Sequence, residues 1–483
     1  MNLPMVQRIL GLMLLLFSLT MLPPIGVSFL HADDHWYPFA AAFAVVASIG
    51  ALLYLPVRKV QRDLRLRDGF LVVAMFWICL GLAGATPLLI TDVPRLSFTD
   101  AVFEAVSGFT TTGATVIVGL DTLPTSILYY RQQIQWLGGM GIIVLAVALL
   151  PVLGVGGMSL YKAETPGPVK DQKLTPRIAH TAKALWLVYL VLTAACALAY
   201  WLAGMDAFDA ISHAFSTLST GGFSPYDASL ARFDSYAIDM IAIFFMLAGG
   251  TSFALHFLMF RQRSVVAYWR EPEFRAYVLI VAAFVTVVTC YLWIAGTYGS
   301  LAEAFRYGAF QVVSIQTSTG FLTTDFSVWP GALPALIMLT TFIGGCAGST
   351  AGGIKVIRWL LVFKQGTVEL RRLVHPSAEI PVKIADKTVP VSVMNAVAGF
   401  FAIYLVLFGG MMLLLMTFGL DQVTAWSAVA TCINNAGPGL GAVAANFREV
   451  PDAAKWVCTL AMLIGRLELF TLIVLFTPDF WRR

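Results

Sequence analysis

The stretch "SGFTTTGATV", Ser107–Val116, is the most informative segment of this chain, because it interrupts apolar sequence with hydroxyl groups and glycines. It carries no charge and lies between two long apolar runs. Threonine and glycine have low helix propensities, so the segment makes a poor transmembrane helix. Non-helical backbone at membrane depth is tolerated only where protein buries it or where it lines a water-filled cavity.

The composition indicates that the rest of the chain is suited to a lipid bilayer. Of the 483 residues, 59% are hydrophobic and 12% are charged. The apolar residues fall in runs of about 20, the length that a helix needs to cross a hydrocarbon core of about 30 Å. These runs predict an all-α polytopic membrane protein whose helices form one body, without a separate soluble domain.

Two apolar runs, Ile9–Leu30 and Phe39–Leu55, precede the polar stretch. The first could pass for a secretory signal, but it is long and a second run follows at once, so we predict a retained membrane helix. The six cysteines are scattered and have neither CxxC pairs nor metal-ligand spacing. We therefore predict neither disulfides nor a zinc site.

The positions of the charges predict how the spans are oriented. If the spans alternate, most of the 31 Lys and Arg residues fall at the two termini and in one set of four connections. These connections are Arg58–Arg67, Lys162–Lys183, Arg261–Arg275 and Lys355–Lys387. The positive-inside rule places this set, and both termini, in the cytoplasm. The basic stretch "RKVQRDLRLR" is then a cytoplasmic loop rather than a nucleic-acid patch, and the net negative outer face would concentrate cations.

The polar stretch recurs along the chain at intervals of about 100 residues. Four segments, "SGFTTTG", "STLSTGG", "SIQTSTG" and "TCINNAG", end at Gly113, Gly222, Gly320 and Gly437. Each follows a segment too short to span a membrane, and each such segment lies between two longer apolar runs. One such loop alone would be an ordinary turn, and the fourth depends on the other three. The recurrence predicts a unit of helix, half-helix with polar loop, and helix, present four times.

Four polar loops in equivalent positions most economically converge on one axial path, where they would form a pore. The glycine that ends each loop permits unusual backbone conformations and leaves room for carbonyl oxygens to face a bare cation. Each half-helix would enter from the outer side and direct the negative end of its dipole toward the pore centre. Residues suited to helix starts stand near the outer ends: Asp100, Asp209, Asp421, and Ser300 with Glu303.

With these motifs the chain resembles the Trk/Ktr/HKT superfamily of cation transporters, and most closely the membrane subunits of bacterial Trk-type potassium uptake systems. The resemblance covers nearly the whole chain and includes "SGFTTTGATV", "QWLGGMGIIVLAVALLP", "GVGGMSLYKAETPGP", "STGGFSP", "GGCAGSTAGGIKVIR" and "IGRLELFTL". It implies two additional N-terminal helices and four pore units around one central ion pore. Their ranges are 1–68 for the helices and 69–162, 163–263, 264–375 and 376–483 for the units.

The resemblance implies that the four loops form a selectivity filter that binds potassium. The filter residues would be Thr110, Thr111, Thr112, Gly113, Ser219, Thr220, Gly221, Gly222, Thr317, Ser318, Thr319, Gly320, Asn434, Asn435, Ala436 and Gly437. In the superfamily, a serine in place of the first-unit glycine accompanies sodium permeation, so Gly113 favours potassium. K+ is then the transported ion, and the chain is expected to bind no cofactor.

The resemblance also implies a homodimer in the bacterial inner membrane, with one pore per protomer. Its expected partners are the lipid bilayer and a ring of cytosolic regulatory subunits that bind a nucleotide of the NAD or ATP type. Nucleic acid is not an expected partner.

Two further features concern gating. In "LTTFIGGCAGSTAGGIKVIRWLL" an apolar helix is predicted to break at Gly344 and resume near Ile354, because glycine disfavours a helix interior. By resemblance the break is an intramembrane gate loop with gating residues Gly344, Gly345, Gly348, Ser349, Thr350, Gly352 and Gly353; a kink or packing motif is the alternative. A phosphate-binding loop is rejected, since GxxxxGK[ST] is absent and no strand precedes it.

Arg466 lies well inside the last apolar run, where a charge is costly and usually faces the bundle interior or a water-filled cavity. By resemblance it is a gating residue in the pore below the filter. A structural ion pair with Glu468 is the alternative, although residues i and i+2 point to different faces of a helix.

The leading interpretation is channel-like potassium uptake, and the alternative is a sodium-permeable or proton- or sodium-coupled cation transporter of the same architecture. A membrane potential of 100 mV supplies about 2.3 kcal/mol per charge, so uptake needs no visible coupling site. An enzyme would need paired carboxylates, a His–Glu metal motif or an activated nucleophile within the spans, and the sequence shows none. A transporter of organic solutes would usually show two broken helices in related halves rather than four loops.

Overall fold

The computed structural model describes residues 2–60, 66–141, 178–385, 387–467 and 469–482. The predicted all-α fold is confirmed, since most of the described residues are helical. The one sheet in those ranges is a two-stranded antiparallel pair, β1 (Lys383–Ile384) with β2 (Lys387–Thr388).

Six helical segments within the described ranges are long and apolar enough to cross a membrane. They are Leu3–His31 (α1, η1 and α2), Tyr37–Val57 (α3 and η2), Arg67–Ile90 in α4, Lys183–Leu202 in α9, Pro272–Ile294 (α14) and Val391–Thr417 (α18). Their outer faces carry large apolar side chains, and Leu279, Leu405 and Val406 are each at least 66% exposed. Apolar surface of this kind suits a lipid environment.

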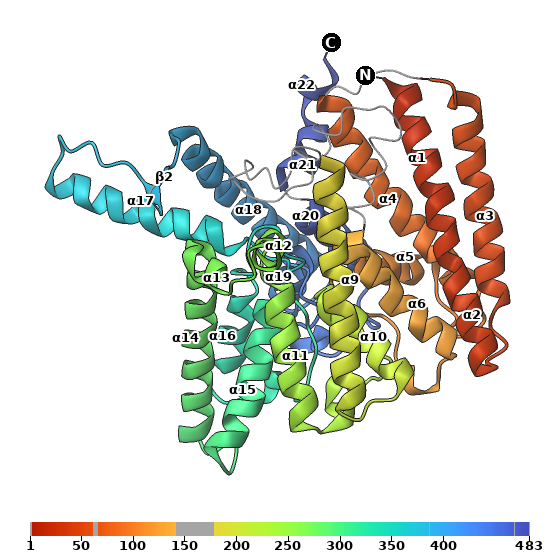
Figure 1. Ribbon diagram of the computed structural model, residues 1–483, viewed down its shortest axis with the longest axis horizontal. Helices are drawn as coiled ribbons and strands as arrows, with labels where there is room; N and C mark the ends of the chain where they lie inside the picture. The colour runs from red at the N-terminus through yellow and green to blue at the C-terminus, as the bar shows by residue number, and fades with distance from the viewer. Residues whose placement is uncertain (1, 61–65, 142–177, 386, 468, 483) are drawn as a thin grey trace.

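The N-terminal helices form one edge of the bundle (Figure 1). Helix α1 (Leu3–Ser18) continues through η1 (Leu19–Met21) into α2 (Leu22–His31), and α3 (Tyr37–Tyr54) with η2 (Leu55–Val57) returns beside it. Gly11 and Gly50 lie at their crossing, where a Cβ atom on Gly11 would lie 2.9 Å from the Gly50 carbonyl oxygen. Small residues at this crossing let the two backbones approach closely.

Four short helices alternate with the long ones: α5 (Phe98–Phe109), α10 (Ala207–Leu218), α15 (Leu301–Gln316) and α19 (Gln422–Ile433). Each follows a long helix, and these are α4 (Leu66–Ile90), α9 (Ile178–Leu202), α14 (Pro272–Ile294) and α18 (Val391–Thr417). From Ala101 to Phe109, all of α5 is buried. The other three short helices are likewise buried mainly in their C-terminal halves, so the ends that lead into the polar loops lie inside the protein.

Side-chain oxygens cap the N-termini of all four short helices. The capping residues are Ser97, Asp206, Ser300 and Asp421, each of which accepts a hydrogen bond from a backbone N–H in the first turn. Ser300 and Asp421 agree with the sequence expectation. Asp100 and Asp209 also lie near the helix starts, in the first turn, but they donate their backbone N–H to the caps Ser97 and Asp206 and are not the caps themselves.

Each helix that follows a short one leads into a second element, across a break or a change of helix type. They are α6 (Thr125–Trp136) with the π turn η4 (Leu137–Gly141), α11 (Tyr236–Gly249) with α12 (Phe253–Gln262), α16 (Leu333–Thr340) with α17 (Val356–Val374), and α20 (Asp452–Leu467) with α21 (Leu469–Ile473). The axes of α11 and α12 differ by 96°. Helix α17 leaves the bundle sideways and leads into the β1–β2 hairpin (Figure 1).

The remaining elements are short. They are η3 (Leu120–Thr122), η5 (Ser229–Phe233), α13 (Val266–Arg270), η6 (Phe326–Val328), η7 (Gly441–Val443), η8 (Val474–Phe476) and α22 (Pro478–Trp481). The beginning of α1 and helix α22 lie at the same end of the bundle (Figure 1). An even number of crossings would give that arrangement.

Candidate functional site

The four glycine-terminated segments, far apart in sequence, meet in a closed ring. A Cβ atom placed on any of the four glycines would come within 3.0 Å of a carbonyl oxygen in the next segment. The contacts run in order: Gly113 with Gly221, Gly222 with Thr319, Gly320 with Ala436, and Gly437 with Thr112. The residue contacted is always the one before the neighbouring glycine. Only glycine fits at these positions, because any side chain would displace the neighbouring backbone.

The backbone of each segment repeats the same conformation. The glycines Gly113, Gly222, Gly320 and Gly437 have φ angles of +82°, +78°, +82° and +85°, and the residues two positions earlier (Thr111, Thr220, Ser318 and Asn435) have φ between +53° and +57°. Left-handed conformations are uncommon for residues other than glycine. In every segment the amide of the residue before the glycine donates to the carbonyl of the Ser or Thr six residues before the glycine, at 2.8–2.9 Å. The four loops are therefore equivalent in geometry as well as in sequence.

Side chains join the loops to one another and to the helices around them. The Thr110 and Thr112 hydroxyls lie 2.7 Å apart, and Asn435 Nδ2 donates to Thr112 Oγ1 at 2.9 Å, which links the fourth loop to the first. Thr317 and Thr319 repeat the hydroxyl pair in the third loop, at 2.8 Å. The Asn435 bond therefore joins two loops and the hydroxyl pairs fix single loops, without any charged group in the loops.

Gln135 on α6 was not singled out by the sequence analysis, yet it clamps the second loop. Its Nε2 donates to the Gly221 carbonyl oxygen at 2.7 Å, and its Oε1 accepts from the Phe223 N–H at 3.0 Å. The side chain is fully buried. The sequence does not distinguish it from Gln132 and Gln133, which stand in the same segment.

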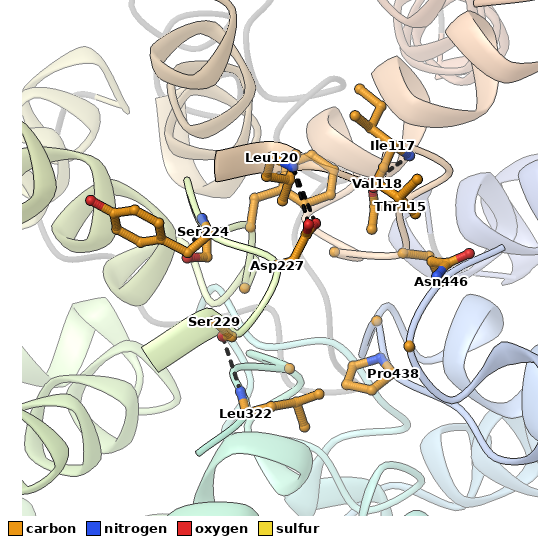
Figure 2. A pocket seen from close by; sticks show the side chains of 18 of the residues that line it. Thr115, Ile117, Val118, Leu120, Ser224, Asp227, Ser229, Leu322, Pro438 and Asn446 are labelled. Atoms are coloured by element: carbon orange, nitrogen blue, oxygen red, sulfur yellow. Dashed lines mark hydrogen bonds between the residues drawn. The ribbon is translucent and has the colours of Figure 1, made fainter. Parts of the chain in front are cut away.

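A cavity of about 300 Å³ lies against the four glycines and is lined by residues from all four repeats. Figure 2 shows how hydrogen bonds join the segments around it. The Asp227 carboxylate accepts from the Gly119 and Leu120 amides at 2.8 and 3.2 Å, and Ser229 Oγ accepts from the Leu322 amide at 3.2 Å. The cavity is large enough for several water molecules or hydrated ions.

The predicted gate-loop residues lie in the break between α16 and α17, next to the ends of the short helices. The Gly352 amide donates to Ser318 Oγ at 2.5 Å, and the Gly353 amide donates to the Asn434 carbonyl oxygen at 3.1 Å. Thr350 Oγ1 donates to the Leu218 and Gly249 carbonyl oxygens at 2.9 and 3.0 Å. Ser318, Asn434 and Leu218 precede the glycine of their own segment and Gly249 belongs to α11, whereas the cavity is lined by the glycines and the residues after them. In the second, third and fourth repeats the loop and the cavity therefore contact opposite ends of the segment.

The break begins earlier than predicted, since α16 ends at Thr340 rather than at Gly344. The hydroxyls of Thr340 and Thr341 donate to backbone carbonyls three residues earlier, at 2.7 and 2.9 Å. Such local bonds compete with helix continuation. Helix α17 begins at Val356, two residues later than expected.

Glu273, at the start of α14, joins the middle of this loop to the first turn of α17. Its Oε1 accepts from the Ala347 amide at 2.7 Å and from the Ile357 amide at 3.2 Å, and the residue is 8% exposed. The sequence places Glu273 in a basic connection beside Glu271, so no pattern distinguished it from a solvent-exposed acid.

Arg466 joins three parts of the chain. From α20, it donates to the Thr350 carbonyl oxygen in the loop at 3.0 Å and to the Gly138 and Gly139 carbonyl oxygens in η4 at 2.6 and 2.7 Å. The guanidinium also lies 5.8 Å from the centre of the Trp77 ring. Glu468, the alternative partner considered from sequence, lies outside the described residues.

Comparison with known proteins places these features in a family. Residues 36–483 match the model of a family described as "TrkH: Cation transport protein". The chain is 55% identical over 483 residues to the Trk system potassium uptake protein TrkH of Halomonas elongata, covering 100% of both chains. It is 51% identical over 477 residues to the Escherichia coli protein of that name, covering 99% of each. The crystal structure of the potassium transporter TrkH from Vibrio parahaemolyticus superposes over 100% of both chains, with a TM-score of 0.91 and 52% identity.

Proposed function

Because this chain belongs to the TrkH family of cation transport proteins, we propose that it is the membrane subunit of a potassium uptake system, with K+ as the transported ion. It is a membrane transporter and not an enzyme. The observation that carries the proposal is the closed ring of four equivalent loops.

We propose that the four loops are the selectivity filter, with the sixteen residues named from sequence as its lining. In a filter, backbone carbonyl oxygens replace the water around a K+ ion. The ring supports this role, because four loops with one conformation present the same backbone groups around one axis. The short helices end at these loops, and the negative ends of their dipoles would stabilise a cation there. The four pore units, with the predicted boundaries, are part of this proposal.

We propose that the loop between α16 and α17, together with Arg466, is the gate. The loop lies against the ends of the filter segments opposite the cavity, and Arg466 donates to its Thr350 carbonyl oxygen. A cation leaving the filter on that side would meet both the loop and a fixed positive charge. Opening then requires the loop to move, which would break the bonds to Ser318, Asn434 and Arg466.

We propose that the loop side faces the cytoplasm of a bacterial inner-membrane protein and the cavity faces outward. The basic connections and both termini support this orientation through the positive-inside rule. We also propose a homodimer that is regulated by a cytosolic nucleotide-binding ring. The relatives' names describe a Trk system, which supports further components. Co-purification of such a subunit, and a change in flux when its nucleotide is added, would test the assembly.

The proposed function is tested by reconstituting the purified chain in lipid vesicles and measuring K+ and Na+ flux at a clamped voltage. We expect K+ flux to exceed Na+ flux. Equal flux of both ions would support the sodium-permeable alternative instead. Measuring a variant that lacks several residues of the Gly344–Gly353 loop controls for a closed gate, and absence of cation flux in both proteins would refute the proposal.

A further inference from the structure

From the middle of each short helix, a buried polar side chain reaches the segment that follows the glycine of that repeat. The contacts are Glu104 with Thr115 and Val116, His213 with Ser224, Gln311 with Thr323 and Thr324, and Ser427 with Leu440. The first three side chains occupy the same position, nine residues before their glycine, and Ser427 lies one residue earlier in its repeat. These contacts therefore form a second layer behind the loops, which braces the chain just beyond each glycine.

The first of these contacts is made by a charged side chain, whereas the neutral side chains of Gln311 and Ser427 make the corresponding contacts in the third and fourth repeats. Glu104 is 0% exposed, accepts from Thr115 Oγ1 at 3.0 Å and from the Val116 amide at 2.9 Å, and forms an ion pair with Arg131 at 2.9 Å. Arg131 is 1% exposed. A buried ion pair costs desolvation and is weak support for stability by itself. The pair therefore calls for an explanation beyond holding one segment.

Arg131 extends the first brace to the second repeat. Its Nη1 donates to the Ser224 carbonyl oxygen at 3.1 Å, and its guanidinium lies 4.2 Å from the centre of the Phe223 ring. Ser224 is also the residue whose hydroxyl contacts His213. A continuous path of contacts thus joins α5, α6 and α10 directly behind Gly113 and Gly222.

Arg131 also brings a positive charge to the wall of the cavity. It and Asp227 are the charged residues among the described residues that line this space. Glu104 contacts the guanidinium from behind and offsets its charge. Without Glu104, a cation approaching the glycines would pass an uncompensated guanidinium.

We propose that Glu104 and Arg131 are a positioning pair that sets the ion selectivity of the filter by fixing the segments after Gly113 and Gly222 relative to each other. In addition, Glu104 keeps the cavity passable for cations by neutralising Arg131. The inference rests on the proposed function, because it assigns these residues a role in the same filter. It predicts two separable effects, one on selectivity through position and one on rate through charge.

The test compares Glu104→Gln with the double variant Glu104→Gln/Arg131→Met in vesicles, by K+ and Na+ flux. Glu104→Gln should lower the K+/Na+ flux ratio by about tenfold, the effect of weakening one charge-assisted hydrogen bond, and should also reduce K+ flux. The double variant should recover most of the K+ flux, since no unpaired charge remains, but should keep the lowered ratio. If Glu104→Gln fails to fold, the flux ratio of the double variant alone tests the positioning role.

Asp239→Asn is the matched control. Asp239 is 1% exposed and pairs with Arg306 at 2.6 Å, and this pair joins α11 to α15; Arg306 also pairs with Asp234, twelve residues after Gly222, but no hydrogen bond within the described part of the chain joins the pair to the residues directly after a loop glycine. Its loss should reduce thermal stability and leave the flux ratio unchanged. A wild-type ratio in both folded Glu104 variants, or an equal fall in the ratio for Asp239→Asn, would overturn the inference. Failure of the wild-type protein to discriminate between K+ and Na+ would instead overturn the proposed function.

Discussion

Replacing Gly113 with alanine should impair ion selection more than replacing Gly119, a glycine six residues later. Both have positive φ angles, +82° and +74°, so both variants carry a backbone strain of about 1–3 kcal/mol. Their surroundings differ. A Cβ atom on Gly119 would have its nearest neighbour at 3.8 Å, whereas one on Gly113 would collide with the Gly221 carbonyl oxygen. The difference between the two variants therefore isolates the contact within the ring.

The size of the effect follows from that collision. To reach ordinary contact, the Gly221 carbonyl would have to move by about 1 Å, whereas binding sites require their ligating groups to be placed to within about 0.5 Å. The Gln135 side chain, which donates to the same carbonyl, resists that movement. We expect the K+/Na+ flux ratio of Gly113→Ala to fall by at least about tenfold, equivalent to about 1.4 kcal/mol. Gly113→Ser should do the same, because its Cβ atom meets the same oxygen.

The assay is K+ and Na+ flux in vesicles, with thermal unfolding measured on the same preparations. Gly119→Ala should lose stability through strain alone and retain the wild-type flux ratio. If folded Gly113→Ala and Gly119→Ala show the same ratio, the Gly113 contact does not contribute to ion selection. The assignment of the first loop to the filter would then be refuted.

Three further predictions concern the gate. Deleting several residues of the Gly344–Gly353 loop should raise basal K+ flux, and unaltered flux with intact expression would reduce the loop to packing. Arg466→Ala should also raise basal flux. Two unit charges about 4 Å apart repel by about 4 kcal/mol at an effective dielectric of 20, so the increase should stay below roughly a thousandfold, and Arg466→Lys should change flux much less. Reduced thermal stability without any gain in flux would contradict the barrier role. Glu273→Gln should raise basal flux by several-fold, because a neutral amide accepts more weakly from the Ala347 and Ile357 amides. The control Glu303→Gln, at an exposed helix start, should leave flux unchanged. Equal flux in the two variants would show that Glu273 does not restrain the loop.

Hydropathy and glycine spacing were sufficient to predict the all-α membrane fold and the positions of four short helices. Lipid cannot hydrogen-bond to the backbone, so a chain must satisfy its polar groups within helices or bury them, and both solutions leave marks in the sequence. Boundaries were less accurate. The caps Ser97 and Asp206 each lie three residues before Asp100 and Asp209, the acids that the sequence suggested. Helix α16 ends at Thr340, before the predicted break at Gly344, because cap and hydroxyl bonds depend on local geometry rather than on composition.

The sequence by itself determined which segments cannot be ordinary helices, since low helix propensity and the repeat are properties of local residues. Only the tertiary structure decided what those segments contact. The carbonyl that each glycine contacts lies in another repeat, and Glu273 binds a loop more than seventy residues away. Glu104 pairs with Arg131 on α6, and Arg131 in turn donates to Ser224 in the second repeat. Such partners depend on how whole helices pack, because helix packing brings together residues whose separation along the chain carries no periodic signal.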